Sequence, residues 1–189
     1  MTGMTGQETT YSKAARHFHW WTVLLVAIQV PVGLYMVYRA GVTNFDALTN
    51  TLYSSHKSLG LLILALVAAR LVYRLRHGAP RDEPTLTLFE KAASHATHWG
   101  LYLLLLVVPI LGWIGISMYP ALNVFGIVDI PALASPNTDT ANRVFMLHKY
   151  LAYLVVALVG MHVAGALFHY VIRKDGVLAR MLPWAGRRS

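Results

Sequence analysis

Three histidines lie in one apolar stretch of the chain, LHKYLAYLVVALVGMHVAGALFHY, which covers Leu147–Tyr170. His162 follows His148 by fourteen residues, and His169 comes seven residues later. At about 100° of turn per helical residue, all three imidazoles lie on one stripe, with the first two about 21 Å apart along the axis. Histidines inside membrane-spanning helices usually mark function. The spacing suits one ligand in each of two metal centres stacked through a membrane; the alternative is three histidines that hydrogen-bond neighbouring helices.

The composition indicates an integral membrane protein with one domain. Of the 189 residues, 56% are hydrophobic and 13% are charged, whereas a soluble domain carries about a quarter charged residues. We expect no cleaved signal peptide, because the polar start leads directly into a histidine and a full-length apolar segment. Cysteine is absent, which excludes disulfides, iron–sulfur clusters and haem attached through a CxxCH motif. Any metal must then be held by histidine, methionine or carboxylate.

Four apolar segments are long enough to cross a bilayer, so the expected fold class is an all-α, integral membrane four-helix bundle. The expected spans are 20–38, 56–73, 99–118 and 147–170, the third belonging to a helix that begins near Leu88. We predict that His56 and His148 begin the second and fourth helices. His19 should lie inside the first helix, which then begins before Trp20. The connections 39–55 and 119–143 are expected to be loops, the second with room for a short surface element.

Lysine and arginine are concentrated at both ends of the chain and between the second and third spans. The other two loops hold little beyond Arg39 and Arg143. By the positive-inside rule, both termini are expected on the cytoplasmic side, which also accounts for the net charge of +8 without nucleic acid. The expected organisation is a disordered cytoplasmic N-terminus at 1–10, a four-helix transmembrane domain at 11–183 and a basic cytoplasmic tail at 184–189.

This orientation sorts four histidines into two pairs by depth. His56 and His148 form an outer pair, and His19 and His162 form an inner pair about 21 Å deeper. Two neutral imidazoles from facing helices can fill both axial positions of a haem iron. Such ligation leaves no open site for oxygen and suits electron transfer, so two b-type haems are the expected cofactors.

Glycines lie near both pairs, and other metals fit the pattern less well. Gly60 is one turn from His56 and Gly165 is near His162, where each either lets a macrocycle approach the backbone or serves ordinary helix packing. Zinc prefers four ligands close together rather than distant pairs. A histidine-lined transporter would want acidic partners, and the four expected spans contain no Asp or Glu.

Long pieces of the chain resemble the bacterial-type cytochrome b-561 family, which is related to the cytochrome b subunits of nickel hydrogenases. The matching pieces are RHFHWW, YSSHKSLG, HATHWGLYLLLLVVPILGW, LHKYLAY and GMHVAGALFHYVIRKDGVLARMLP, which together extend from Tyr11 to Pro183. The resemblance implies a four-helix di-haem protein of the bacterial inner membrane. It also implies that His19 and His162 ligate one haem and that His56 and His148 ligate the other, in agreement with the depth argument.

The remaining histidines are His17, His77, His95, His98 and His169. His77 lies in a basic loop and is expected to be solvated. His95 and His98 share one helix face, where they could bond haem propionates, bind quinone or reach the membrane surface. His169 lies one step beyond the inner pair, and the resemblance makes it a candidate quinone contact, since a quinone needs a proton donor near its carbonyl oxygen.

Two lysines directly follow the outer histidines. Lys57 and Lys149 lie on the side that is otherwise poor in cations, where they would form a mouth that attracts a small anionic donor; the alternative is pairing with propionates or head groups. The family includes a superoxide oxidase that passes electrons to ubiquinone. The expected function is therefore electron transfer between an outer-face donor, best matched by superoxide, and membrane ubiquinone. The alternatives are an electron-transfer subunit or carrier that serves a hydrogenase or other dehydrogenase, and a histidine-lined metal transporter without porphyrin.

Overall fold

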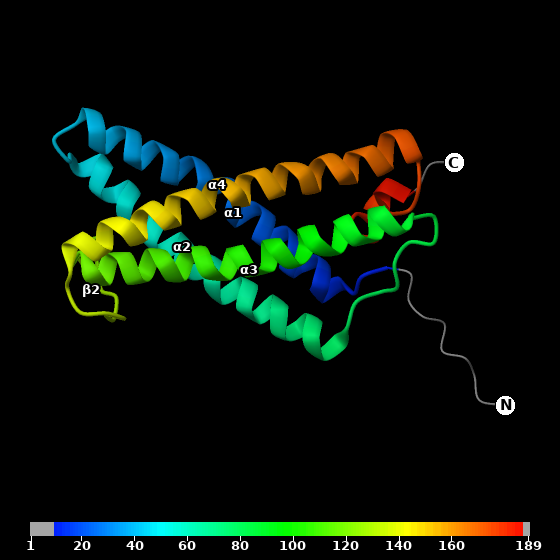
Figure 1. The fold of residues 1–189 in the computed structure, drawn as a ribbon, viewed down its shortest axis with the longest axis horizontal. Helices are drawn as coiled ribbons and strands as arrows, with labels where there is room; N and C mark the ends of the chain where they lie inside the picture. The colour runs from blue at the N-terminus through cyan, green and yellow to red at the C-terminus, as the bar shows by residue number, and fades with distance from the viewer. Residues whose placement is uncertain (1–9, 187–189) are drawn as a thin grey trace.

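The computed structural model describes residues 10–186. Four long helices run up and down through this part of the chain (Figure 1). Their bounds are α1 Lys13–Val42, α2 Ala47–His77, α3 Leu88–Met118 and α4 Thr138–Phe168. The chain enters and leaves at one end of the bundle, here called the terminal end, which also holds the connection from α2 to α3. The opposite end, with the connections from α1 to α2 and from α3 to α4, is called the loop end. Residues 1–9 of the expected N-terminal segment lie outside the described residues, and so do the arginines at 187 and 188.

Each helix begins at a side chain that accepts a hydrogen bond from the backbone of the first turn. These capping residues are Ser12, Asp46, Thr87 and Asn137. At α3 the cap is reciprocal, because the Glu90 side chain returns to the backbone of Thr87 and forms a capping box. After α2, Gly78 takes a left-handed φ of 73° that non-glycine residues rarely adopt, and the helix ends there.

The expectation of four helices is confirmed, and α1 begins before Trp20 as predicted, so that His19 lies inside it. The prediction that His56 and His148 begin their helices is wrong. The helix α2 begins at Ala47 and α4 at Thr138, which puts both histidines more than two turns inside. The physical reason is that the polar residues before these histidines cap and extend the helices instead of forming loops.

Close helix packing joins α1 to α2, α2 to α3 and α3 to α4, whereas α4 does not pack closely along α1 or α2 over the described residues. Figure 1 shows the α1–α2 pair crossing the α3–α4 pair at an angle. The buried core lies on the first three helices and contains Leu25, Ile63, Val67 and Tyr102. The fourth helix therefore lies along one side of the bundle, facing α1 and α2 across a wider separation.

All four helices are long and apolar enough to cross a membrane. Only 6% to 22% of the residues in their most apolar windows are buried inside the bundle. A water-soluble protein would bury such apolar faces, so these surfaces are suited to lipid.

Short elements finish both ends of the bundle. At the loop end, β1 (Asn123–Val124) and β2 (Val128–Asp129) form an antiparallel hairpin, the short surface element expected in that connection. At the terminal end, α4 runs into a π-helical turn, His169–Arg173, followed by 3₁₀ turns at Leu178–Arg180 and Pro183–Gly186.

Candidate functional site

The structure brings together the two histidines expected as the outer pair. The ring of His56, on α2, lies 6.1 Å from the ring of His148, on α4, measured between centroids, and the ring planes are 78° apart. The pair lies in the half of the bundle nearer the loop end. It spans the separation between α4 and the other helices.

Each ring of this pair lies against a glycine on a third helix. A Cβ atom added to Gly33, on α1, would come within 2.8 Å of Cε1 of His56. One added to Gly112, on α3, would come within 3.2 Å of Cε1 of His148. Real Cβ atoms essentially never lie 2.8 Å from another heavy atom, so a residue larger than glycine at position 33 would collide with the His56 ring. Gly60, a glycine expected beside this pair, instead lies near the amide of Gln29.

The two rings of the outer pair differ in their hydrogen bonds to the protein. Nδ1 of His148 donates to the backbone carbonyl of Val108 at 2.9 Å, which leaves a lone pair on Nε2. The amide of Gln29 donates to the backbone carbonyl of His56 at 3.0 Å and lies 3.4 Å from Nε2 of that ring. Nδ1 of His56 is buried and has no hydrogen-bond partner among the described residues. Each ring of this pair therefore has a nitrogen that could bind a metal and that is not fully hydrogen-bonded to protein groups.

The expected inner pair is also brought together. The rings of His19, on α1, and His162, on α4, are again 6.1 Å apart between centroids, with planes at 70°. The guanidinium of Arg70 donates to Nδ1 of His19 at 3.2 Å and also lies 5.1 Å from the ring centroid of Tyr102. Arg70 makes no ion pair with a carboxylate among the described residues. A half-buried cation without a carboxylate partner suits an anionic group near this pair.

A third imidazole lies beside the inner pair. The ring of His98, on α3, is 5.1 Å from that of His162, and Nδ1 of His98 lies 3.2 Å from the hydroxyl of Ser94. His95 behaves differently, because its exposed ring pairs with Asp82 at 3.1 Å. His77 is exposed, as expected, and stacks on Tyr73.

The ring separations discriminate between possible ligand pairs. Two metal–imidazole bonds of about 2 Å, with each ring centre about 1.1 Å behind its nitrogen, put the ring centres about 6 Å apart across one metal ion. Both expected pairs, at 6.1 Å, fit a single central iron. The pair of His98 and His162, at 5.1 Å, is too close for this arrangement. Across the described part of the chain, no cluster of three or more histidine or acidic residues could hold a metal ion, as a zinc site would require.

The two lysines beside the outer pair are held differently. The ammonium of Lys57 donates to the carbonyl of Ala121 at 3.1 Å and to the carbonyl of Asn123. It thereby ties α2 to the connection that carries the hairpin. Lys149 is exposed, and its ammonium lies 5.2 Å from the ring centroid of Tyr150.

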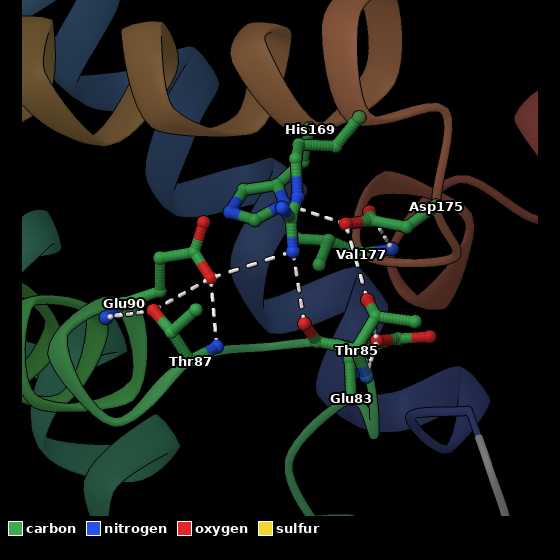
Figure 2. A network of polar contacts seen from close by, with 8 residues as sticks. Glu83, Thr85, Thr87, Glu90, His169, Asp175 and Val177 are labelled. Carbon is green, nitrogen blue, oxygen red and sulfur yellow. Dashed lines mark hydrogen bonds and ion pairs between the residues drawn. The ribbon is translucent and has the colours of Figure 1, made fainter.

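His169, the expected quinone contact, lies in the π-helical turn at the terminal end. It is only 9% exposed, and Nδ1 donates to Asp175 Oδ2 at 2.7 Å (Figure 2). Arg173 donates to the carbonyl of Thr85 at 2.9 Å and lies 3.7 Å from the Glu90 carboxylate. A buried imidazole tied to a buried carboxylate can hold and release a proton.

Several residues of these sites were not found from the sequence. Gly33, Gly112, Gln29 and Arg70 lie on other helices than the histidines they contact, and helical spacing within one segment carries no information about them. Asp175 had a local signal, because the sequence Lys174-Asp175-Gly176 directly follows the apolar run and is typical of a helix end.

The four-helix membrane bundle with facing histidine pairs defines a class, the haem-binding membrane cytochromes. Residues 10–184 match the family model described as prokaryotic cytochrome b561. The chain therefore belongs to the prokaryotic cytochrome b561 family: it is a multi-pass bacterial membrane protein that binds b-type haem and transfers electrons.

Curated relatives cover most of the chain. Cytochrome b561 homolog 2 of Escherichia coli (strain K12) is 32% identical over 179 residues, which is 94% of each chain. The probable superoxide oxidase CybB of Yersinia pestis is 32% identical over 138 residues, or 68% of this chain and 73% of that protein. Cytochrome b561 homolog 1 of Escherichia coli (strain K12) is 27% identical over 174 residues, covering 92% of this chain and 97% of the relative.

Proposed function

We propose that this cytochrome carries two b-type haems and transfers electrons from superoxide at the outer membrane face to ubiquinone. The observation that supports the proposal is that two histidine pairs lie at two depths of one membrane bundle. In each pair the ring centroids are 6.1 Å apart. The helix α4 supplies one histidine to each pair, fourteen residues apart in sequence, or about 21 Å along the helix.

In this proposal His19 and His162 are the ligands of the inner haem, and His56 and His148 are the ligands of the outer haem. A haem b held by each pair would supply reversible one-electron exchange at its iron, and two imidazole ligands would leave no position open to oxygen. The chain's own contribution is to hold the four imidazoles in place. Gly33 and Gly112 leave room for the outer rings, and Val108 fixes the tautomer of His148.

The proposed orientation puts the terminal end in the cytoplasm and the loop end outside, in the bacterial inner membrane. Most lysines and arginines lie at the terminal end, in the connection from α2 to α3, and beyond α4. Cytoplasmic segments of membrane proteins carry this excess of positive charge. The outer pair then faces the side from which superoxide arrives, and His169 lies on the cytoplasmic side.

Superoxide is proposed as the donor because it is a small anion and because Lys57 and Lys149 put positive charge beside the outer pair. The name of the Yersinia pestis relative, probable superoxide oxidase, supports the same donor. Two superoxide ions each lose one electron and become two molecules of oxygen. One ubiquinone accepts those two electrons and two protons and becomes ubiquinol, so that electrons and protons balance. His169 is the proposed contact that supplies protons to the quinone.

The test is the visible spectrum of the oxidised, detergent-purified protein after exposure to an enzymatic superoxide source in the presence of catalase. The proposal predicts sharp α and Soret bands of reduced haem, which fade when a short-chain ubiquinone is added. Bands that develop with dithionite but not with superoxide would overturn the superoxide assignment and favour a carrier fed by a hydrogenase or other dehydrogenase. An absence of haem bands in every state would contradict the whole proposal.

A further inference from the structure

We propose that Asp175 is a positioning residue for His169, one that fixes the imidazole tautomer and orientation needed for proton transfer to quinone. The inference rests on the proposed function for the quinone reaction, but its structural part concerns a pair of side chains that is independent of the haems. The pair is the hydrogen bond of 2.7 Å between Nδ1 of His169 and Oδ2 of Asp175.

The local backbone explains why these two residues meet. The α-helical ladder of α4 ends at Phe168, and the next five residues form a π-helical turn, a feature that is often found at functional sites. Lys174 then takes a left-handed φ of 52°, which reverses the chain, and the amide of Asp175 donates back to the carbonyl of His169 at 3.3 Å. The turn thus returns Asp175 to the histidine six positions before it.

The pair is largely shielded from water. Only 11% of the His169 side chain and 5% of the Asp175 side chain are exposed. A carboxylate buried to this degree is costly unless its oxygens accept hydrogen bonds. Besides the imidazole, Asp175 accepts a bond from the Val177 amide at 3.2 Å, and the Thr85 hydroxyl lies 3.4 Å from Oδ2. In both bonds, to the imidazole and to the Val177 amide, the carboxylate oxygens are the acceptors.

The neighbouring charges contact the connection from α2 to α3, whose Thr85 also lies beside Asp175 (Figure 2). Arg173 pairs with Glu90, whose carboxylate is already used in the capping box with Thr87. Glu83 accepts bonds from the amide and hydroxyl of Thr85. Among the carboxylates of the described residues, Asp175 is the one that is hydrogen-bonded to the His169 imidazole. The arrangement also fixes the C-terminal segment against that connection.

The consequence for the chemistry is a defined tautomer. An ionised carboxylate accepts from Nδ1–H, so the neutral His169 ring carries its lone pair on Nε2. A proton taken up at Nε2 leaves the Nδ1–H bond to Asp175 in place. Because Nδ1 is bonded to Asp175, Nε2 is the ring nitrogen left to give a proton to a quinone carbonyl oxygen and to recover one afterwards.

A purely structural role is the competing explanation, since Asp175 also bonds the Val177 amide. Asp175→Asn separates the two roles. Its side chain keeps the size and one carbonyl oxygen of the aspartate, but an amide N–H directed at the ring makes Nδ1 an acceptor and moves the proton to Nε2. Asp175→Glu restores the charge and serves as the conservative control.

The first readout is the tautomer itself. Protein with ¹⁵N-labelled histidine is measured by NMR, and His169→Ala identifies the His169 ring signals. We expect Nδ1–H in the wild type and Nε2–H in Asp175→Asn, with unchanged haem absorbance in both. A wild-type ring protonated on Nε2 alone, or an identical tautomer in the two proteins, would overturn the inference whatever the fate of the quinone proposal.

The second readout is the rate at which ubiquinone reoxidises protein that has been reduced without oxygen by stoichiometric dithionite. Asp175→Asn should lower the limiting rate by about tenfold or more, with the quinone concentration for half-maximal rate changed by less than about twofold. Asp175→Glu should recover most of the rate. In the His169→Ala background, Asp175→Asn should have no further effect, because the residues act as one unit.

Two results of this kinetic experiment have different meanings. A fully haem-loaded wild type that ubiquinone does not reoxidise contradicts the proposed function. The positioning role is overturned if wild type reacts with ubiquinone and Asp175→Asn reacts at the same rate. It is also overturned if Asp175→Asn lowers the rate by the same factor in the presence and in the absence of His169.

Discussion

His148 faces His56 across the bundle with the two ring centroids 6.1 Å apart, and Nδ1 of His148 is bonded to the carbonyl of Val108. One ring is thus fixed by the neighbouring α3, which packs along α4, while its partner comes from the opposite helix pair. The same separation of 6.1 Å recurs between His19 and His162 in the other half of the bundle. In the proposed function, these two pairs hold the two haems of a stepwise electron path.

Gly33→Ala should remove the outer haem selectively. The added Cβ would lie 2.8 Å from Cε1 of His56 and would push the ring away from His148. Such overpacking costs about 1 to 3 kcal/mol when the neighbours cannot shift, and a ring held by a metal has little freedom to do so. We expect the haem-to-protein ratio, measured by the pyridine haemochrome spectrum, to fall from about two towards about one.

Gly41→Ala is the matched control on the same helix, because its added Cβ would meet nothing within 4 Å. It should keep the full haem content. Gly112→Ala should have a weaker effect than Gly33→Ala, since the corresponding contact with His148 is 3.2 Å. Equal haem content in Gly33→Ala and Gly41→Ala would contradict the predicted role of Gly33.

Lys149→Gln should slow the reaction with superoxide at low ionic strength. Lys149 is exposed, so its charge acts on an approaching anion and does not stabilise the bundle through a hydrogen bond in the described residues. We expect a severalfold lower second-order rate, roughly two- to tenfold, and a weaker dependence of that rate on salt. Stopped-flow haem reduction measures both quantities, and Lys149→Arg should restore them.

Lys57→Gln should have a second effect besides the loss of charge. The Lys57 ammonium is bonded to the carbonyls of Ala121 and Asn123, so its removal also loosens the connection that carries the hairpin. We expect faster proteolytic cleavage within 119–137 in this variant and not in Lys149→Gln. Equal cleavage of both variants and wild type would show that Lys57 does not hold this connection.

Asp46, in the connection from α1 to α2, gives a pH-dependent contribution to stability. Hydrogen bonds from the Thr49 hydroxyl and amide, and the pairing with Arg39, hold the pKa of Asp46 below its ordinary value. A depressed pKa means that the stabilisation is present above the unfolded-state pKa of about 3.9 and is lost as the pH falls through the lower folded-state pKa. Asp46→Asn should therefore melt at a slightly lower temperature than wild type at neutral pH.

The difference in melting temperature between Asp46→Asn and wild type should shrink as the pH falls below the unfolded-state pKa of about 3.9 and the wild-type carboxylate becomes protonated. Circular dichroism follows this unfolding in detergent. A difference that is constant over the whole range would show that the charge of Asp46 does not contribute.

Helical spacing, together with the direction in which each span runs, predicted which histidines would face one another. His148 and His162 belong to one helix, and their separation follows directly from its rise per residue. The helix starts could not be predicted in the same way, because hydropathy marks where a chain enters lipid and not where its hydrogen-bonded turns begin. The caps at Asp46 and Asn137 add more than two polar turns before His56 and His148.

The contacts between helices could not be predicted from the sequence pattern. Gly33 and Gly112 are important only because the packing of α1 on α2 and of α3 on α4 brings them against particular rings. Gly165, expected beside His162, has nothing within 4 Å of an added Cβ. Small residues in membrane helices are common, and a single sequence does not distinguish those that face a ligand from those that face lipid.

The most direct test of the account is the number of haems bound by the wild type and by single histidine variants, measured by pyridine haemochrome against protein concentration. The proposed ligand pairs predict about two haems b per wild-type chain and about one in either His148→Ala or His19→Ala, with low-spin electron paramagnetic resonance signals. His98→Ala should keep both haems, because its ring is 5.1 Å from that of His162 and too close to be its partner across an iron. One haem in the wild type, or a haem lost from His98→Ala but retained in His19→Ala, would contradict the assignment of the two pairs.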